Sequence, residues 1–322
     1  MTANPEGKAL LQRIHLGKGE IWALGAAFGY ALYQVFLGAA MQGEVHNMVA
    51  ATVQAIPVLL FSSAMGWFIN RQGKETTSPF SDWRLIGALV CNGLLLFVVA
   101  TPLMFESLRK GGVLITSPVT GTQVLFAALL AALLLREAFT RTMALGMAIS
   151  VIGVFALTAG RSGADLSPTW WLAVPFALGT ALSWAVAGVL LTYTMRRGVD
   201  PFQAVAIPTI VGLAALNGYL LVTGQIGLYG ETITGIIVTL LVAGVFSAAA
   251  LISLTLALNL TTVASATTLN SLQVALAPVI AWIFLGEDLN LAAAAGILTI
   301  LVGVIMVQRS RLAAQQGRAN DE

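Results

Sequence analysis

Three hydrogen-bonding side chains lie at helical spacing immediately before a long apolar run. Thr116, Thr120 and Gln123 are spaced i, i+4 and i+7, so one face of a helix would carry two hydroxyls and an amide. Asn270 and Gln273 stand in a similar stretch, SATTLNSLQ, which also precedes an apolar run. Such groups bind a polar solute through hydrogen bonds, or they tie one helix to another. Both interpretations stay open at this point.

The apolar run at 124–135 is too short to cross a membrane by itself. Its sequence, VLFAALLAALLL, covers roughly 18 Å as a helix, whereas the hydrocarbon core of a bilayer is about 30 Å thick. The chain has 322 residues, of which 58% are hydrophobic and 9% are charged, and its mean hydropathy is +0.88. Soluble domains carry about 25% charged residues. We therefore expect a polytopic membrane protein in which the polar stretch 116–123 lies inside the bilayer.

Ten apolar segments are separated by mostly short linkers that contain Gly, Pro, Asn and charged residues. We number these segments span 1 to span 10 and expect an all-α integral membrane protein with ten transmembrane helices. The spans lie near residues 21–40, 48–69, 85–105, 113–135, 143–159, 170–194, 202–223, 233–257, 262–285 and 291–307.

A shift of 150 residues aligns the second half of the chain with the first. The shift pairs Gln123 with Gln273. It also pairs Thr120 with Asn270, and we expect both pairs near the bilayer midplane. Because each half holds five spans, an odd number, the two copies must enter the membrane from opposite sides, as inverted five-helix repeats. Further matched positions are Glu137 with Glu287, Gly146 with Gly296 and Gly153 with Gly303. The predicted organisation is a tail, two repeats and a second tail, at 1–20, 21–161, 162–308 and 309–322.

The distribution of Lys and Arg predicts the orientation. With the N-terminus in the cytoplasm, all 16 of these residues except Arg109, Lys110 and Arg161 fall on the cytoplasmic side. This distribution places both termini in the cytoplasm. The expected location is the plasma membrane, as a multi-pass protein of the bacterial inner membrane.

The second copy ends in APVIAWIFLGEDLNLAAAAGILTILVGVIM, at 277–306. Its proline, apolar run, Leu-Gly-Glu and Gly-containing last helix resemble the EamA-type, ten-helix branch of the drug/metabolite transporter superfamily. The first copy departs from this pattern, with Ala128 in place of Pro278 and Arg136 in place of Gly286. The resemblance covers nearly the whole chain. It implies a transporter, often an exporter of amino acids or other small metabolites, with spans 5 and 10 at the periphery and the other spans around a central cavity.

Aromatic and polar side chains also occur at mid-depth in spans 1, 3 and 6. The aromatic rings would stack on an aromatic, amide or cationic group of a substrate, or they would fill the core. Asn92 of span 3 is a further candidate, and a hydrogen bond to a neighbouring helix is an alternative role for it. The residues of spans 1 and 6, in which the shift of 150 pairs 33 with 183 and 34 with 184, are Tyr30, Tyr33, Gln34, Ser183 and Trp184.

Two prolines occupy matching places in spans 2 and 7. Pro57 and Pro208 each end the sequence Ala-Ile-Pro, with an offset of 151 residues. Each proline frees backbone groups and permits a bend, which suits helices that rock during transport. Membrane helices also tolerate proline without any such role.

No Asp, Glu, Lys, Arg or His falls in the middle of a span, which favours a neutral or zwitterionic substrate. We expect a secondary transporter that works by alternating access and exports small metabolites such as amino acids. The alternatives are a facilitative importer and a lipid-handling membrane protein. An enzyme is not expected, because the chain lacks a nucleophile with a base and a metal-binding His-Glu-x-x-His. The expected partners are a small-molecule substrate and the lipid bilayer; we expect no cofactor, no metal ion and, at a net charge of +2, no nucleic acid. The oligomeric state stays open.

Overall fold

The computed structural model describes residues 17–71, 76–135, 140–159, 168–260, 266 and 269–321. Within this part of the chain every regular element is a helix, and no strand is present. The elements of the first half are α2 (Lys18–Met41), α3 (Asn47–Arg71), α4 (Trp83–Gly93), the π-helix η1 (Leu94–Ala100), α5 (Thr101–Gly121), α6 (Gln123–Leu135) and α7 (Arg141–Ala159). Those of the second half are the short 3-10 helix η2 (Trp170–Leu172), α8 (Ala173–Arg196), α9 (Pro201–Val222), α10 (Leu228–Glu231), α11 (Thr234–Leu260), α13 (Gln273–Leu285) and α14 (Leu291–Asp321).

Seven helical segments are long and apolar enough to cross a membrane. One of them, Trp83–Leu130, is 48 residues long and holds both span 3 and span 4. It folds back at Gly112, whose φ of 66° and ψ of −173° are not helical, and a 2.8 Å hydrogen bond joins Ser107 and Thr116 across the fold. The shorter apolar helices Arg141–Leu157 and Gln273–Leu285 supply spans 5 and 9. The all-α fold with ten spans is therefore confirmed.

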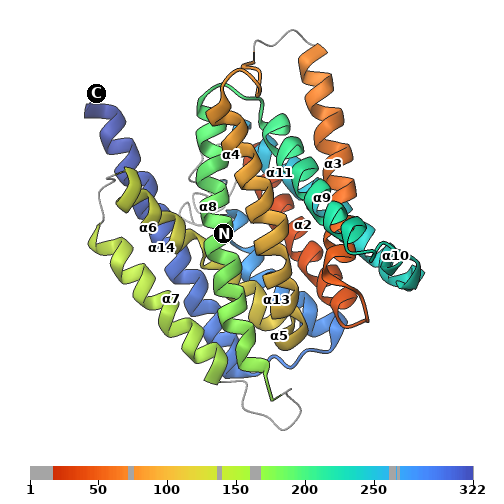
Figure 1. The fold of residues 1–322 in the computed structure, drawn as a ribbon. Coiled ribbons are helices and arrows are strands. Elements are labelled where there is room, and N and C mark those ends of the chain that lie inside the picture. The colour runs from red at the N-terminus through yellow and green to blue at the C-terminus, as the bar shows by residue number, and fades with distance from the viewer. Residues whose placement is uncertain are drawn as a thin grey trace, which may run out of the picture.

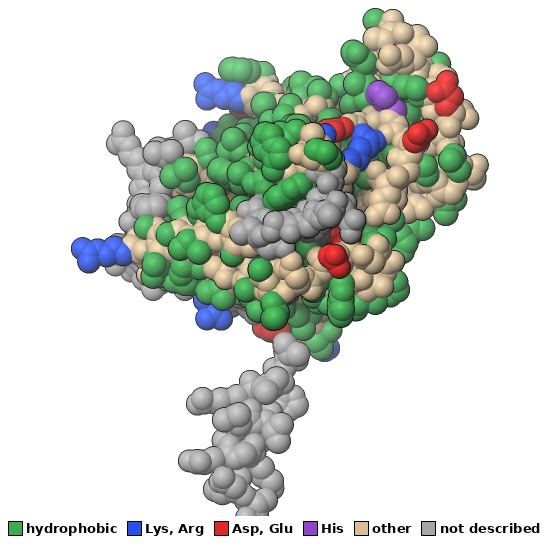
Figure 2. Space-filling model, turned by 90° about the horizontal axis from the view of Figure 1, so that it is seen from below, with side chains coloured by type: hydrophobic (Ala, Val, Ile, Leu, Met, Phe, Trp, Pro, Cys, Tyr) green, Lys and Arg blue, Asp and Glu red, His purple; other side chains and the backbone are tan. Residues whose placement is uncertain are grey.

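The two ends of the helical bundle differ in the helix termini that they carry. We call one the Arg109 end, where α2 ends, α3 begins and the chain folds back at Gly112; it is the lower end in Figure 1. We call the other the Arg197 end, where α3 and α8 end and α4 and α9 begin. Figure 2 looks at the Arg109 end and shows hydrophobic side chains over most of the visible surface, with only a few charged ones between them.

The two halves run in opposite directions through the bundle, as α7 and α14 show. These helices, which are spans 5 and 10, lie side by side at one edge of the bundle (Figure 1). A Cβ atom on Gly146 would lie 2.8 Å from the carbonyl oxygen of Gly303, and one on Gly153 would lie 2.9 Å from that of Gly296. The residue numbers rise along α7 as they fall along α14, so these matching helices are antiparallel. Since they are the same element of each repeat, the repeats are inverted.

Repeat-related contacts also build the centre of the bundle. The helices α3 and α9, which are spans 2 and 7, pack against each other. In addition, α3 packs against α11, which is span 8, and α9 packs against α4, which belongs to span 3. A side chain on Gly93 would overlap the carbonyl group of Pro208. In the same way, a Cβ atom on Gly244 would lie 2.9 Å from the ring of Pro57. Gly93 and Gly244 are 151 positions apart, as are Pro57 and Pro208. Each of the two matching prolines therefore packs against one of two matching glycines.

Spans 4 and 9 are each interrupted at the same place. The sequence predicted one continuous helix over 113–135, but α5 ends at Gly121 and α6 begins at Gln123. The hydroxyl of Thr122 donates to the carbonyl of Val119 at 2.6 Å, and such side-chain bonds compete with the helical ones. In span 9, α13 likewise begins at Gln273. The two breaks touch, because a side chain on Gly121 would overlap that of Val274.

The last helix is longer than its apolar segment. α14 reaches Asp321, whereas span 10 was expected to end near 307, so most of the predicted polar tail is helical. A hydrogen bond of 2.7 Å from the Ser271 hydroxyl to Oε1 of Gln308 ties the helix to the break in span 9.

Candidate transport cavity

A cavity of about 400 Å³ lies between the two halves. Described residues of seven spans contribute to its wall, namely spans 1, 2, 3, 4, 6, 7 and 8. None of the residues that line it carries an acidic or basic side chain. The polar side chains of the wall belong to Tyr30, Tyr33, Gln54, Asn92, Thr101, Gln123, Trp184, Thr209 and Ser247.

Gln54 of α3 is a cavity residue that sequence reasoning missed. The hydroxyl of Tyr33 donates to its Oε1 atom at 3.1 Å, and both side chains line the cavity. With Oε1 engaged, the Nε2 group is the donor that Gln54 offers to a bound solute. The only signal in the sequence was an amide inside the apolar segment AATVQAIPVLL, three residues before Pro57.

Asn92 of α4 lines the cavity and also makes a hydrogen bond to a neighbouring helix. Its Nδ2 group donates to the carbonyl of Ala187 at 2.8 Å, which joins α4 to α8. The residue also lines the cavity although only 2% of it is accessible. Because the donor is engaged, the Oδ1 acceptor is the group available to a solute. A helix contact therefore fixes the orientation of a cavity amide.

Gln123, the first residue of α6, lines the cavity from the break in span 4. Within the described part of the chain, no hydrogen bond to its side-chain amide is present. Both its donor and its acceptor are therefore free to turn toward a bound molecule. A break at Thr122 separates Gln123 from the helix that carries Thr116 and Thr120, and of these three residues only Gln123 is among the described lining residues.

Aromatic rings line much of the apolar part of the wall. Tyr30, Tyr33 and Trp184 are joined there by Phe97, which lies in the π-helix η1. Pro102 follows η1 and has no backbone N–H, and the Thr101 hydroxyl donates to the Leu96 carbonyl at 2.8 Å. Single π-helical turns inside α-helices occur frequently at functional sites. The first half carries one here at the cavity wall.

Three of the expected site residues lie outside the cavity lining and bond within the protein. Thr116 is fully buried and pairs with Ser107. Thr120 donates to the carbonyl of Thr116 at 2.8 Å, and Ser183 donates to that of Gly179 at the same distance. In this state of the molecule these hydroxyls satisfy helix backbones and one another.

Three further expected residues also lie outside the lining, with amides that are not fully bonded. Gln34 is 5% exposed, and its buried Oε1 atom has no hydrogen-bond partner among the described residues. The buried Oδ1 atom of Asn270 likewise has none. Gln273 is half-buried at the start of α13. The structure thus brings Tyr30, Tyr33, Asn92, Gln123 and Trp184 together and leaves the other six predicted residues elsewhere.

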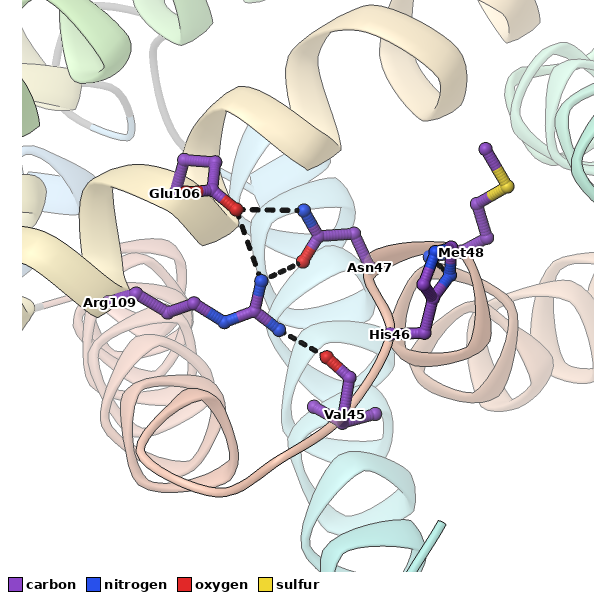
Figure 3. A network of polar contacts seen from close by, with 6 residues as sticks. All are labelled: Val45, His46, Asn47, Met48, Glu106 and Arg109. Carbon is purple, nitrogen blue, oxygen red and sulfur yellow. Dashed lines mark hydrogen bonds and ion pairs between the residues drawn. The ribbon is translucent and has the colours of Figure 1, made fainter. Parts of the chain in front are cut away.

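A second hollow, of about 870 Å³, opens at the Arg109 end. Figure 3 shows the network of polar contacts that forms one wall of it. The Arg109 guanidinium contacts Oε1 of Glu106 at 3.1 Å, donates to Oδ1 of Asn47 at 2.5 Å and also donates to the carbonyl of Val45. Asn47 in turn donates to Glu106 at 3.1 Å. This network fixes the loop between α2 and α3 against the end of span 3.

The family model that describes EamA-like transporters matches the chain twice, over residues 17–159 and 171–309. The chain belongs to the EamA-like transporter family. The chain is therefore a multi-pass membrane transporter of the drug/metabolite type, and each match covers one of the inverted repeats. No curated protein matches it. One crystal structure, described only as that of a protein, superposes with a TM-score of 0.62 over 92% of this chain and 98% of its own, at 15% sequence identity. At that identity the likeness shows the fold alone.

Proposed function

We propose that this EamA-like transporter exports small neutral or zwitterionic metabolites, with amino acids as the first class to test. The observation that carries the proposal is the cavity between the repeats, whose wall combines amides and aromatic rings without an acidic or basic side chain. A solute with a net charge would be desolvated there without a counter-ion, which costs several kcal/mol. A neutral or internally compensated solute avoids this cost.

The wall offers groups for both parts of a zwitterion. The amide donors of Gln54 and Gln123 suit a carboxylate, since each can donate through Nε2. The Oδ1 atom of Asn92 suits an ammonium group, and the faces of Tyr30 and Trp184 suit either an ammonium group or an apolar side chain. The same groups would serve a neutral solute through ordinary hydrogen bonds.

The proposed orientation is compatible with export. The bias of Lys and Arg favours the Arg197 end in the cytoplasm and the Arg109 end outside. In α8 and α9 the cavity wall extends to Leu191 and Ala204, each within about five residues of a helix terminus at the Arg197 end. A solute would therefore enter from the cytoplasm in this state, which suits an exporter of the plasma membrane, as in a bacterial inner membrane. A facilitative importer with the same cavity is the second candidate.

A lipid-handling role fits the cavity less well. Helices from both halves surround the polar wall groups, and large apolar side chains that are highly exposed, such as Phe155 and Phe284, lie outside the wall. A lipid-handling protein would instead need a polar groove that faces the bilayer.

Export profiling combined with flux measurements tests the proposal. Cells that express the chain and matched cells that express Gln123→Leu are loaded with mixed metabolites, and the extracellular pools are compared. We expect one neutral or zwitterionic class to accumulate outside only with the native chain, at equal membrane abundance. Accumulation of a purely anionic or cationic class would contradict the proposed substrate. Faster uptake from the medium, without release, would support the importer.

A further inference from the structure

The two halves contribute unequally to the cavity. Several residues of one half line it, whereas the residues at the matching positions of the other half are packed in the protein. In transporters built from inverted repeats, the opposite state arises when the two halves exchange their arrangements around a fixed site. Each wall residue therefore has a counterpart in the other half. The offset is 150 for spans 1 and 6 and for spans 4 and 9, as Gly29/Gly179 and Gln123/Gln273 show. It is 151 for spans 2 and 7 and for spans 3 and 8, as the matched contacts of Gly93 with Pro208 and Gly244 with Pro57 show.

The last turns of α8 line the cavity, whereas the matching turns of α2 are closed. Gly188 and Leu191 lie on the wall near the Arg197 end. Their counterparts at the Arg109 end are Gly38, where a side chain would overlap Val113, and Met41, which is 2% exposed. Leu37, the counterpart of the wall residue at 187, is fully buried. The bundle is therefore open along one copy of this helix and packed along the other.

The same exchange explains where four predicted site residues lie. Trp184 and Gln123 line the cavity, and their counterparts Gln34 and Gln273 do not. Gln34 is more than nine-tenths buried, and within the described part of the chain its Oε1 atom has no hydrogen-bond partner. An unpaired buried acceptor costs free energy in an apolar medium, so a state that exposes it to solute or water gains that interaction. The unpaired amide is independent evidence that this helix face has a second environment.

A chain of hydrogen bonds holds the Arg109 end closed between α3 and α9. The hydroxyl of Tyr229 donates to Oδ1 of Asn217 at 2.6 Å, and Nδ2 of Asn217 donates to the hydroxyl of Thr52 at 3.2 Å. We call Thr52, Asn217 and Tyr229 the clasp. The counterparts of Thr52 and Asn217 at the Arg197 end are Gln203 and Gly66. A Cβ atom on Gly66 would lie 3.5 Å from Cγ of Gln203, and Gly66 has no side chain that could form a matching hydrogen bond.

We propose that Thr52, Asn217 and Tyr229 are the external gate of this transporter, and that they close off an outward-facing form of the substrate site lined by Leu37, Gly38 and Met41, with hydrogen-bonding groups from Gln34 and Gln273. This form opens when the clasp breaks. Met41 already borders the hollow at the Arg109 end, so the opened helix face joins that hollow and gives the solute an exit. The ligand is the same neutral or zwitterionic solute, and the inference rests on the proposed transport function.

Cysteine labelling of intact cells tests the outward-facing form without knowledge of the substrate. In a Cys91→Ser background, Leu37→Cys and the control Leu157→Cys, which lies between α7 and α14, are exposed to an impermeant thiol reagent from outside. Both positions are fully buried in the described state. Adding Tyr229→Phe removes one clasp bond and should speed labelling at 37 about threefold. Adding Asn217→Leu instead removes both clasp bonds and should speed labelling at 37 about sevenfold, because each hydrogen bond contributes roughly the same free energy to the closed state.

The graded outcome decides the inference. Labelling at 37 that rises in this order, with labelling at 157 unchanged, supports the outward-facing form. Labelling at 37 that stays at the level of 157 in all three backgrounds overturns it, and so does an equal rise at both positions, which reports general loosening. Flux measured on the same Tyr229→Phe protein separates the two proposals: preserved flux without labelling refutes only the outward-facing site, whereas absent flux of every neutral and zwitterionic solute in the native chain refutes the transport function.

Discussion

The carboxylate of Glu287 accepts a hydrogen bond of 2.8 Å from the backbone N–H of Val113. Its second oxygen accepts one of the same length from the N–H of Leu114. These are the first N–H groups after the fold at Gly112, and helix N-termini favour a negative charge. A loop of the second repeat thus caps a span of the first, which gives the Leu-Gly-Glu sequence at 285–287 a structural role.

Replacing Glu287 with Gln should therefore destabilise the protein. The amide retains one acceptor oxygen but loses the charge, so we expect a loss of about 1 to 2 kcal/mol in the free energy of unfolding. Thermal unfolding in detergent measures the effect. Asp288→Asn is the matched control, since Asp288 is the neighbouring acid and is exposed. Equal melting temperatures for the two variants would refute the capping role.

A methyl group at position 93 should be poorly tolerated. Gly93→Ala places a Cβ atom against the Pro208 carbonyl, where backbone must move to make room. Overpacking of this kind costs about 1 to 3 kcal/mol. Gly87→Ala, in the same helix, meets nothing within 4 Å and should be neutral or slightly stabilising. The check is the melting temperature of each variant in detergent, compared with that of the native chain. A similar fall in melting temperature for both variants would contradict a close contact between position 93 and Pro208.

The orientation predicts that the two ends of the bundle label from different sides. In the Cys91→Ser background, Asp288→Cys at the Arg109 end should react with an impermeant thiol reagent in intact cells. Arg197→Cys at the other end should react only after the cells are opened. Both positions are exposed, so burial does not limit either reaction. The reverse pattern would contradict the proposed orientation of the bundle.

The architecture was accessible from the sequence because hydrophobic length and repetition are properties of the chain itself. Each half has five spans, and a shift of 150 residues aligns the halves, which predicted inverted repeats. The contact of Gly146 with Gly303, between antiparallel helices, shows that the repeats are inverted. Glu137, Arg136 and Arg161, on which part of the repeat and charge argument relied, lie outside the described residues. The domain boundaries near 161 and 308 stay predictions.

The cavity was less accessible, because its wall depends on how helices rotate against one another. Asn92 and Gln54 come from different helices, and no spacing along the chain shows that both face one cavity. The break at Thr122 was also missed, since a threonine that bonds to its own helix looks in the sequence like one that faces a partner. Periodicity along one helix could not reveal either feature.

The two glutamines give the last prediction, because they decide why polar groups occupy the interior of the bilayer. If Gln123 and Gln273 only tied helices together, Leu in their place would cost little, since a similarly sized apolar side chain suits this environment. If they bind the solute, each Gln→Leu change leaves a polar group of the solute unpaired, at a cost of about 1 to 3 kcal/mol, or roughly 5- to 150-fold in affinity.

We expect both variants to reach the membrane at normal abundance and melting temperature, yet to transport poorly in proteoliposomes. The structure distinguishes them further, because Gln123 lines the cavity and Gln273 is not among the described lining residues. Gln123→Leu should therefore weaken solute binding to the state described above, whereas Gln273→Leu should leave that binding intact and slow the complete cycle. Binding and flux measured on the same preparations test this split. Intact flux in both variants, or flux lost only together with melting temperature, would assign the two amides to helix packing.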